Sequence, residues 1–207
     1  MEKKPPPPLS GSEQKKSKRG CIIAAIVCGV LAVLAIPIIG IFAELLFPAF
    51  SNANQAADTV HAEHDARNLK NAISVYFLEY RKYPVRNPTG DSTVRTEGEL
   101  MAILLGNDSE GEKDGMNPRR ITFLTGKQAK PTRDGGWRKG INPNYEENPG
   151  LYDPWGNPYW VKLDADNDNR LSEIDGVGEL NESIAIWSAG PDGDPATWED
   201  NIKSWYE

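Results

Sequence analysis

The sequence predicts an α+β fold, in which one long N-terminal helix packs on a small antiparallel β-sheet. Three observations lead to this prediction. An uncharged apolar run, Cys21–Ala43, opens the ordered part of the chain, and a stretch with the spacing of an amphipathic helix continues from it to Tyr80. Short segments rich in β-branched and aromatic residues follow in the second half, as expected for strands. A helical part followed by strands is typical of α+β proteins.

The apolar run predicts a membrane-spanning helix. Its 23 residues carry no charge, and at about 1.5 Å per residue they cover the roughly 30 Å hydrocarbon core of a bilayer. The main alternative is a cleaved signal peptide, whose apolar stretch is usually shorter, about 7–15 residues, and ends at small residues. We therefore expect membrane insertion.

Charge predicts the orientation of this helix. Residues 1–20 hold six Lys and Arg against two Glu, whereas no Lys or Arg lies between Ala43 and Arg67. The positive-inside rule keeps such a tail in the cytoplasm and exports the rest. In a bacterium this predicts a single-pass inner-membrane protein, with its C-terminal domain in the periplasm or, within a filament, outside the cell.

The chain divides into four parts on this basis. They are a Pro- and Lys-rich cytoplasmic tail (1–20), a transmembrane helix (21–48), an amphipathic continuation of the same helix (49–84) and a C-terminal globular domain (85–207).

Local patterns predict the elements of the exported part. Pro48 is expected to kink the long helix without ending it, and Tyr83-Pro84 to end it. The apolar stripe of the amphipathic half comprises Val60, Leu69, Ile73, Tyr76, Phe77 and Tyr80. A short helix is predicted at Glu97–Leu105, and strands are predicted at Ile121–Leu124, Tyr159–Leu163 and Ser183–Ser188. The last two strands flank an acidic turn and should pair antiparallel.

The exported part is acidic. After Gly140 the chain has three basic residues against fifteen acidic ones, within a net charge of −7 for the whole chain. Such a surface repels nucleic acid and attracts cations. The two cysteines, Cys21 and Cys28, both lie in the apolar run, so we expect a core or a bound metal, and no disulfide, to stabilise the exported domain.

Two acidic segments are candidate calcium sites. Asp164, Asp166 and Asp168 alternate, and Asp175 stands at position 12 of the same segment, which follows the calcium-loop pattern. The alternative is a solvated turn, because Asp and Asn also favour tight turns. The second segment, Trp187–Asn201, contains Asp192, Asp194 and Asp200, whose mutual repulsion requires screening by water or by a cation.

His61 and His64 stand three residues apart on the long helix, a spacing that suits a metal ion. No third ligand is clearly placed to complete a site, so we expect two solvated side chains.

The order of motifs along the chain resembles that of the type IV pilin superfamily, and most closely the major pseudopilin of the type II secretion system. The matching pieces are Tyr83-Pro84, Arg95–Leu105, Asp153–Tyr159 (DPWGNPY) and Ser188–Gly193 (SAGPDG), in an overall match of roughly Ile38 to Trp205. The resemblance implies a pilin-like fold with a long helix packed on a small antiparallel sheet.

The resemblance also implies a calcium ion in the last loop. By position, Asp192 and Asp200 match the family's loop aspartates, and carbonyl groups near Ser188 would complete the shell; Asp194 is our own addition. Gly20 followed by Cys21 is similar to the family's processing site, although the fifth residue counted from Cys21 is Ala25 and not the family's glutamate.

These patterns predict a non-catalytic structural subunit of a type II secretion or type IV pilus-related machine. Its implied partners are copies of itself, other pseudopilin-like subunits and inner-membrane assembly components. One alternative is an uncut, membrane-anchored domain that binds polysaccharide, protein or cell wall through its tryptophans. Another is a glycosidase with paired carboxylates, which the turn-like placing of the aspartates disfavours.

Overall fold

The computed structural model describes residues 14–88, 90–107, 115–144 and 147–205. Within these ranges, no side chain is described at residues 14–19, 21, 25, 30, 32, 34–52 and 173. The chain divides into two units, Met1–Asn54 and Gln55–Glu207. The four-part division predicted above concerns the membrane, and its boundaries stay predictions.

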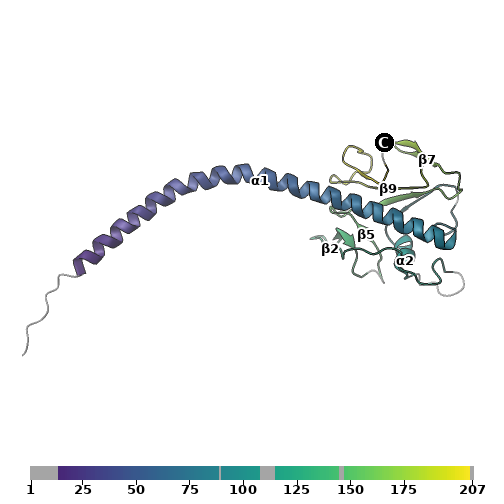
Figure 1. Cartoon of the computed structure of the whole chain (residues 1–207), viewed down its shortest axis with the longest axis horizontal. Helices are drawn as coiled ribbons and strands as arrows, with labels where there is room; N and C mark the ends of the chain where they lie inside the picture. Colours follow the sequence, from purple (N-terminus) through teal and green to yellow (C-terminus); the bar gives the residue numbers. More distant parts are fainter. Residues whose placement is uncertain (1–13, 89, 108–114, 145–146, 206–207) are drawn as a thin grey trace, which may run out of the picture. The chain divides into compact units, whose positions relative to one another are not determined.

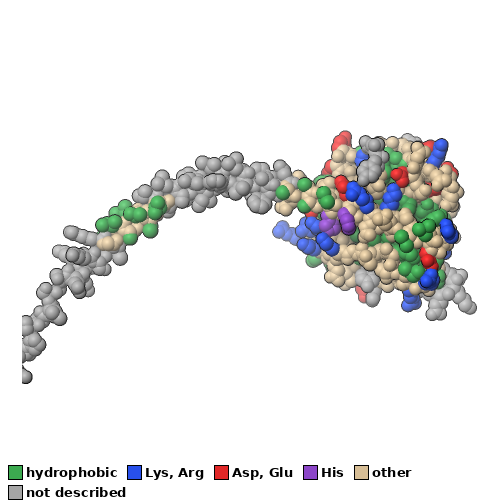
Figure 2. All heavy atoms as spheres, in the orientation of Figure 1, with side chains coloured by type: hydrophobic (Ala, Val, Ile, Leu, Met, Phe, Trp, Pro, Cys, Tyr) green, Lys and Arg blue, Asp and Glu red, His purple; other side chains and the backbone are tan. Residues whose placement is uncertain are grey.

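Helix α1 (Gln14–Tyr80) supplies the described part of the first unit. Its described apolar side chains in this unit are exposed, from 50 % at Val27 to 70 % at Val33, and they form the hydrophobic patch on the N-terminal helix in Figure 2. Among the described residues, no helix combines the length and the apolar character needed to cross a membrane. Most side chains of the predicted span, Cys21–Ala43, lie outside the described residues, and the span stays a prediction.

In the second unit, α1 buries one face against the globular part. Leu69, Ile73 and Tyr76 are completely buried, as their helical spacing predicts. Val60 was expected on the same stripe and is 65 % exposed, so that prediction was wrong. The buried face extends further toward the N-terminus to Ala62, which is completely buried and whose carbonyl accepts the hydroxyl of Tyr159 at 3.3 Å.

The end of α1 at Tyr80 confirms the predicted end of the helix, but the residue that terminates it differs from the prediction. The helix ends at Tyr80, three residues before Tyr83. Arg81 adopts a left-handed conformation with φ of 54°, and its amide donates a 2.8 Å hydrogen bond to the carbonyl of Phe77. The left-handed residue terminates the helix before Pro84 could do so.

Helix α2 (Glu99–Leu105) confirms the predicted short helix within two residues. The strand predicted at Ile121–Leu124 is wrong, because this segment pairs with no strand. The amides of Phe123 and Leu124 donate instead to the carbonyl of Leu104, at 2.8 and 3.1 Å. The Ile121–Leu124 segment is therefore hydrogen-bonded to the C-terminal end of α2.

The main sheet has four antiparallel strands in the order β1-β6-β9-β10. They are β1 (Ser92–Arg95), β6 (Trp160–Leu163), β9 (Ile184–Ser188) and β10 (Ile202–Lys203). The predicted antiparallel pairing of the two strands around the acidic turn is confirmed by β6 and β9. The other strands form two-stranded ladders (Figure 1) and are β2 (Lys130–Pro131), β3 (Trp137–Arg138), β4 (Gly140–Ile141), β5 (Leu151–Tyr152), β7 (Leu171–Ile174) and β8 (Gly178–Leu180).

The two faces of this sheet contribute side chains to two different hydrophobic clusters, because side chains alternate along a strand. Val161 and Ile186 belong to the larger cluster, together with the buried face of α1. Trp160 and Trp187, on the opposite face, belong to a second cluster with the β7–β8 hairpin and the C-terminal tryptophans. The predicted α+β class with an antiparallel sheet is therefore confirmed.

Candidate metal site

Strand register brings together two aspartates that are far apart in the sequence. β1 pairs with β6 so that Ser92 lies opposite Leu163. In an antiparallel pair the residue before Ser92 and the residue after Leu163 emerge at the same end. These residues are Asp91 and Asp164, and the acidic turn that follows β6 adds Asp166 beside them.

Asp91, Asp164 and Asp166 form a carboxylate cluster at this end of the sheet. One carboxylate oxygen from each residue lies within 4.8 Å of the other two. In the part of the chain that the structure describes, no other three acidic, histidine or cysteine side chains meet this condition. Three carboxylates at this separation repel one another unless a cation or bound protons compensate the charge.

Hydrogen bonds fix two of the three carboxylates in place. Asp164 is 2 % exposed, and it accepts the amides of Asp168 at 3.1 Å and Asn169 at 2.9 Å. Asp91 accepts the amide of Ser172 through Oδ2. Its other oxygen, Oδ1, is buried and has no hydrogen-bond partner among the described residues. A buried acceptor without a partner is costly, and a bound cation would satisfy it.

The rest of the predicted calcium loop lies outside this cluster. Asp168 accepts the amide of Arg170 at 2.8 Å, as in an ordinary Asx turn. Asp175 is exposed and lies at the end of the β7–β8 hairpin, where its carbonyl accepts the indole N–H of Trp198 at 2.7 Å. The structure therefore brings Asp164 and Asp166 together with Asp91, and holds Asp168 and Asp175 in other roles.

The aspartates of the last loop are bonded within the loop itself. Asp192 accepts the amide of Asp194 at 2.9 Å and the Thr197 hydroxyl at 2.6 Å, and the hydroxyl bond lowers the pKa of Asp192. Asp194 accepts the amide of Ala196 at 2.9 Å. Asp200 is half-buried next to Gly190. Among the described residues, these three carboxylates do not belong to a cluster in which three ligand atoms lie within 4.8 Å of one another.

The hydroxyl of Ser188 joins the last loop to the DPWGNPY motif. It accepts the amide of Gly190 at 3.2 Å and donates to Oδ2 of Asp153, the first residue of that motif. The other oxygen of Asp153 accepts the amides of Trp155, Gly156 and Asn157 at 2.7–2.9 Å. Asp153 therefore orders its own turn and ties it to the end of β9, and burial raises the pKa of its carboxyl.

The two histidines share a carboxylate partner on α1. His61 Nδ1 lies 3.0 Å from one oxygen of Asp65, and His64 Nδ1 lies 3.5 Å from the other. The side chain of His64 is 77 % exposed, as predicted, whereas that of His61 is only 16 % exposed. The expectation of a solvated His61 was therefore wrong. Figure 2 shows histidine side-chain surface next to Lys and Arg side chains.

Of the predicted processing site, Gly20 is described as an exposed helical residue. The side chain of Cys21 lies outside the described residues.

Sequence reasoning missed Asp91 as a site residue. It lies in the polar stretch before Thr96, and its distance from the acidic turn is 73 residues along the chain. The available signal was weak: a prediction of the strand at Ser92–Arg95 and of its register with β6 would have been needed. No local pattern supplies that register.

The fold and site define a small α+β protein in which an amphipathic helix packs on an antiparallel sheet that carries a carboxylate cluster. No family model matches the chain. The chain is similar to the type II secretion system core protein G of Aeromonas hydrophila, with 27 % identity over 172 residues, which cover 83 % of this chain and 85 % of that protein. This similarity supports a distant relationship to the pilins and pseudopilins.

Proposed function

We propose that this protein is a pseudopilin-like, non-catalytic structural subunit of a type II secretion or type IV pilus-related envelope machine. The similarity to a secretion-system core protein over 83 % of the chain carries the proposal. The packing of α1 on an antiparallel sheet, and the order of the SAGPDG and DPWGNPY motifs, agree with it.

In this proposal the first half of α1 lies in the inner membrane and later among the helices of neighbouring subunits. The apolar side chains that the structure describes there, such as Ile23 at 62 % and Leu31 at 60 % exposure, require cover by lipid or protein. The basic tail stays in the cytoplasm, and the acidic domain faces the periplasm. Other pseudopilin-like subunits and inner-membrane assembly components are the expected partners.

The natural cysteines provide a test of assembly. Cys28 is exposed on α1, and Cys21 stands seven residues, or about two helical turns, before it. If apolar helices of several copies pack side by side, mild oxidation of membranes containing the full chain should give a ladder of disulfide-linked oligomers. The Cys28→Ser variant, with one cysteine left, should give dimers at most.

A wild-type chain that stays monomeric after oxidation in membranes that also contain the secretion machine would contradict assembly. The mass of the mature chain separates the two remaining interpretations. A chain that begins at Cys21 has been processed like a pseudopilin, whereas an intact N-terminus indicates an uncut, anchored relative.

We propose further that calcium stabilises the exported domain. The residues around Asp91, Asp164 and Asp166 fit a hard cation, because they offer oxygen ligands. One of these oxygens, Asp91 Oδ1, is buried and has no hydrogen-bond partner in the described part of the chain. The last loop, with Asp192, Asp194, Asp200 and the region of Ser188, is the second candidate. To bind an ion there, the carboxylates would have to give up the hydrogen bonds that they accept within the loop.

Thermal unfolding of the full chain in detergent tests this proposal. Calcium at about 100 times its Kd should stabilise the fold by about 2.7 kcal/mol and raise Tm by about 5–10 °C. Two double variants separate the sites: Asp91→Asn with Asp166→Asn, and Asp192→Asn with Asp200→Asn. The first pair should remove most of the rise. A wild-type Tm that does not respond to calcium would overturn the proposal.

A further inference from the structure

The sequence holds two sequons for N-linked glycosylation, in which asparagine is followed by any residue except proline and then by serine or threonine. One begins at Asn107 (NDS) and the other at Asn181 (NES), while Asn87 (NPT) is excluded by its proline. A sequon can act as an acceptor where it lies on an exposed loop of an exported protein. The surroundings of the two asparagines therefore decide between them.

Asn181 lies on an exposed connection between two strands. It follows β8 directly, and residues 181–183 join β8 to β9. Asn181 is exposed, so its side-chain amide can reach an enzyme without any change in the hydrophobic core. A glycan on this nitrogen would point into solvent and would displace no packed side chain.

The sequon at Asn107 has the opposite surroundings. Nδ2 of Asn107, the nitrogen that would carry a glycan, is buried and has no hydrogen-bond partner in the described part of the chain. The backbone amide of Asn107 donates a 2.8 Å hydrogen bond to the carbonyl of Ala102 in α2. An enzyme could reach this nitrogen only after the end of α2 had opened. The fold therefore favours Asn181 as the acceptor.

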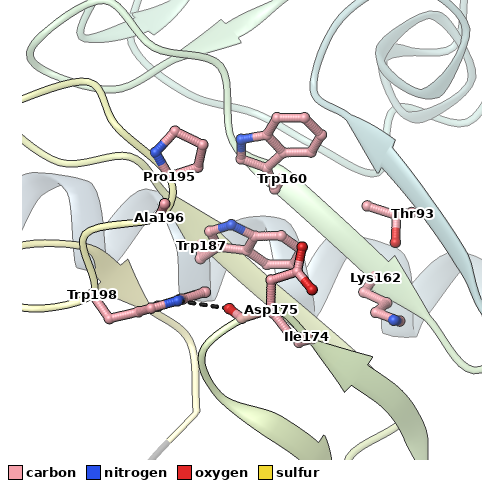
Figure 3. A pocket seen from close by; sticks show the side chains of 9 residues that line it. All are labelled: Thr93, Trp160, Lys162, Ile174, Asp175, Trp187, Pro195, Ala196 and Trp198. Atoms are coloured by element: carbon pink, nitrogen blue, oxygen red, sulfur yellow. Dashed lines mark hydrogen bonds between the residues drawn. The ribbon is translucent and has the colours of Figure 1, made fainter.

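The strand before Asn181 is held less firmly than the strands of the main sheet. In the described structure β8 pairs with β7 alone, and the register of this pair is irregular between Leu171 and Ile174. The bond from Trp198 to the carbonyl of Asp175 fixes the turn of the hairpin (Figure 3), whereas β8 leads away from that turn to Asn181. A two-stranded ladder opens at lower cost than central strands, so the sequon can extend into an enzyme's active site.

An acidic residue stands two places before Asn181. The carboxylate of Glu179 lies 3.0 Å from the guanidinium of Arg170, and both side chains are more than half exposed, at 55 % and 60 %. Exposed ion pairs contribute little stability, so Glu179 can exchange Arg170 for a cationic group of an enzyme. Bacterial oligosaccharyltransferases select sequons with an acid at this place, which a charge-assisted hydrogen bond can hold. The corresponding residue before Asn107 is Leu105.

We propose that Asn181 accepts an N-linked glycan from a bacterial oligosaccharyltransferase on the periplasmic side of the membrane. Nδ2 of Asn181 attacks C1 of the first sugar of a lipid-linked oligosaccharide, and a C1–N bond forms as the bond from C1 to the pyrophosphate oxygen breaks. One amide proton is released, and the lipid pyrophosphate is the leaving group. The inference rests on the export of the domain in the proposed function, because the enzyme and its donor act outside the cytoplasm.

Expression of the full chain in cells that contain a bacterial oligosaccharyltransferase and its lipid-linked glycan tests the proposal. The chain should carry a reference acceptor peptide, with the same extended sequon, at its C-terminus. The reference peptide reports whether the domain has been exported. Mass spectrometry of the proteolytic fragments should show one glycan on the reference peptide, one on Asn181 and none on Asn107.

Variants of the sequon confirm the position of the glycan. Asn181→Gln changes an exposed side chain, so it should fold like wild type and lose the modification. Ser183→Ala should also lose it, whereas Ser183→Thr, which keeps a hydroxyl, should retain it. Glu179→Gln should lower the modified fraction several-fold. Ser109→Ala, which removes the sequon at Asn107, is the matched control and should be modified like wild type.

The outcomes separate this inference from the proposed function. A glycan on the reference peptide together with an unmodified Asn181 would overturn the inference and leave the proposed function intact. A glycan on Asn107 in place of Asn181 would overturn it as well. If the reference peptide stays unmodified in cells that glycosylate another exported protein, the domain is not exported. That result would contradict the proposed orientation and overturn the inference with it.

Discussion

The indole N–H of Trp198 donates a 2.7 Å hydrogen bond to the backbone carbonyl of Asp175. This bond joins the last loop to the turn of the β7–β8 hairpin, two acidic segments that the sequence presents as separate candidate calcium sites. The rings of Trp187 and Trp205 lie 6.1 Å from that of Trp198. The two segments are thus held together by an aromatic cluster and one hydrogen bond.

Removal of this hydrogen bond should loosen both segments together. Trp198→Phe keeps an aromatic ring and loses the N–H donor, at an expected cost of about 1 kcal/mol in unfolding free energy. Hydrogen exchange should become faster both in 175–180 and in 192–200. In the control Trp155→Phe these segments should exchange as in wild type. Faster exchange in one segment alone would show that the bond does not couple them.

Gly190, in the SAGPDG motif, should tolerate no side chain. A Cβ there would lie 2.4 Å from the carbonyl oxygen of Asp200, and φ is 65°. Gly90 has nearly the same φ, 61°, and a Cβ added to it would meet nothing within 4 Å, so Gly90→Ala measures the backbone strain alone, about 1 kcal/mol. Urea unfolding should show a clearly larger loss for Gly190→Ala. Equal losses would mean that the Asp200 contact is easily relieved.

The buried face of α1 should dominate the stability of the globular unit. Leu69 is completely buried, whereas Leu78 on the same helix is 64 % exposed. Leu69→Ala should cost about 2–5 kcal/mol, because the cavity that it leaves cannot fully close. Leu78→Ala changes the same atoms at an exposed position and should cost less than about 0.5 kcal/mol. Denaturant unfolding of both variants measures the difference, and similar costs would contradict this packing.

Asp153 should make stability depend on pH in mildly acidic solution. Burial raises the pKa of its carboxyl above the usual 3.8, and the hydrogen bonds from Ser188 and Asn157 act in the opposite direction. The folded chain thus holds this proton more tightly than the unfolded chain. The resulting contribution to stability is complete below the unfolded pKa and is lost as the pH rises through the folded pKa.

The Asp153→Asn variant isolates this effect, because its side chain does not titrate. The unfolding free energy of wild type minus that of the variant should fall as the pH is raised from about 3.5 to 7. Urea unfolding at several pH values measures this difference. A difference that grows with pH would mean that the hydrogen bonds outweigh burial and that the folded pKa is lowered.

Much of the fold could be predicted from local patterns. Leu69, Ile73 and Tyr76 follow helical spacing, and the β-branched segments of β6 and β9 indicate strands, so their burial and antiparallel pairing were expected. Ile121–Leu124 has the same composition as a strand and forms none. Its amides meet the end of α2, a contact that no local propensity encodes.

Composition and periodicity act locally, and they were enough to establish the acidic character of the C-terminal part, its lack of cysteines, the α+β class and the Asp-rich turns. Which side chains meet depends instead on the packing of the whole domain. The register of β1 on β6 placed Asp91 against Asp164, and the return of the last loop placed Trp198 on Asp175. Both contacts join residues far apart in the chain. Strand pairing determines the first contact, and the packing of the tryptophans determines the second.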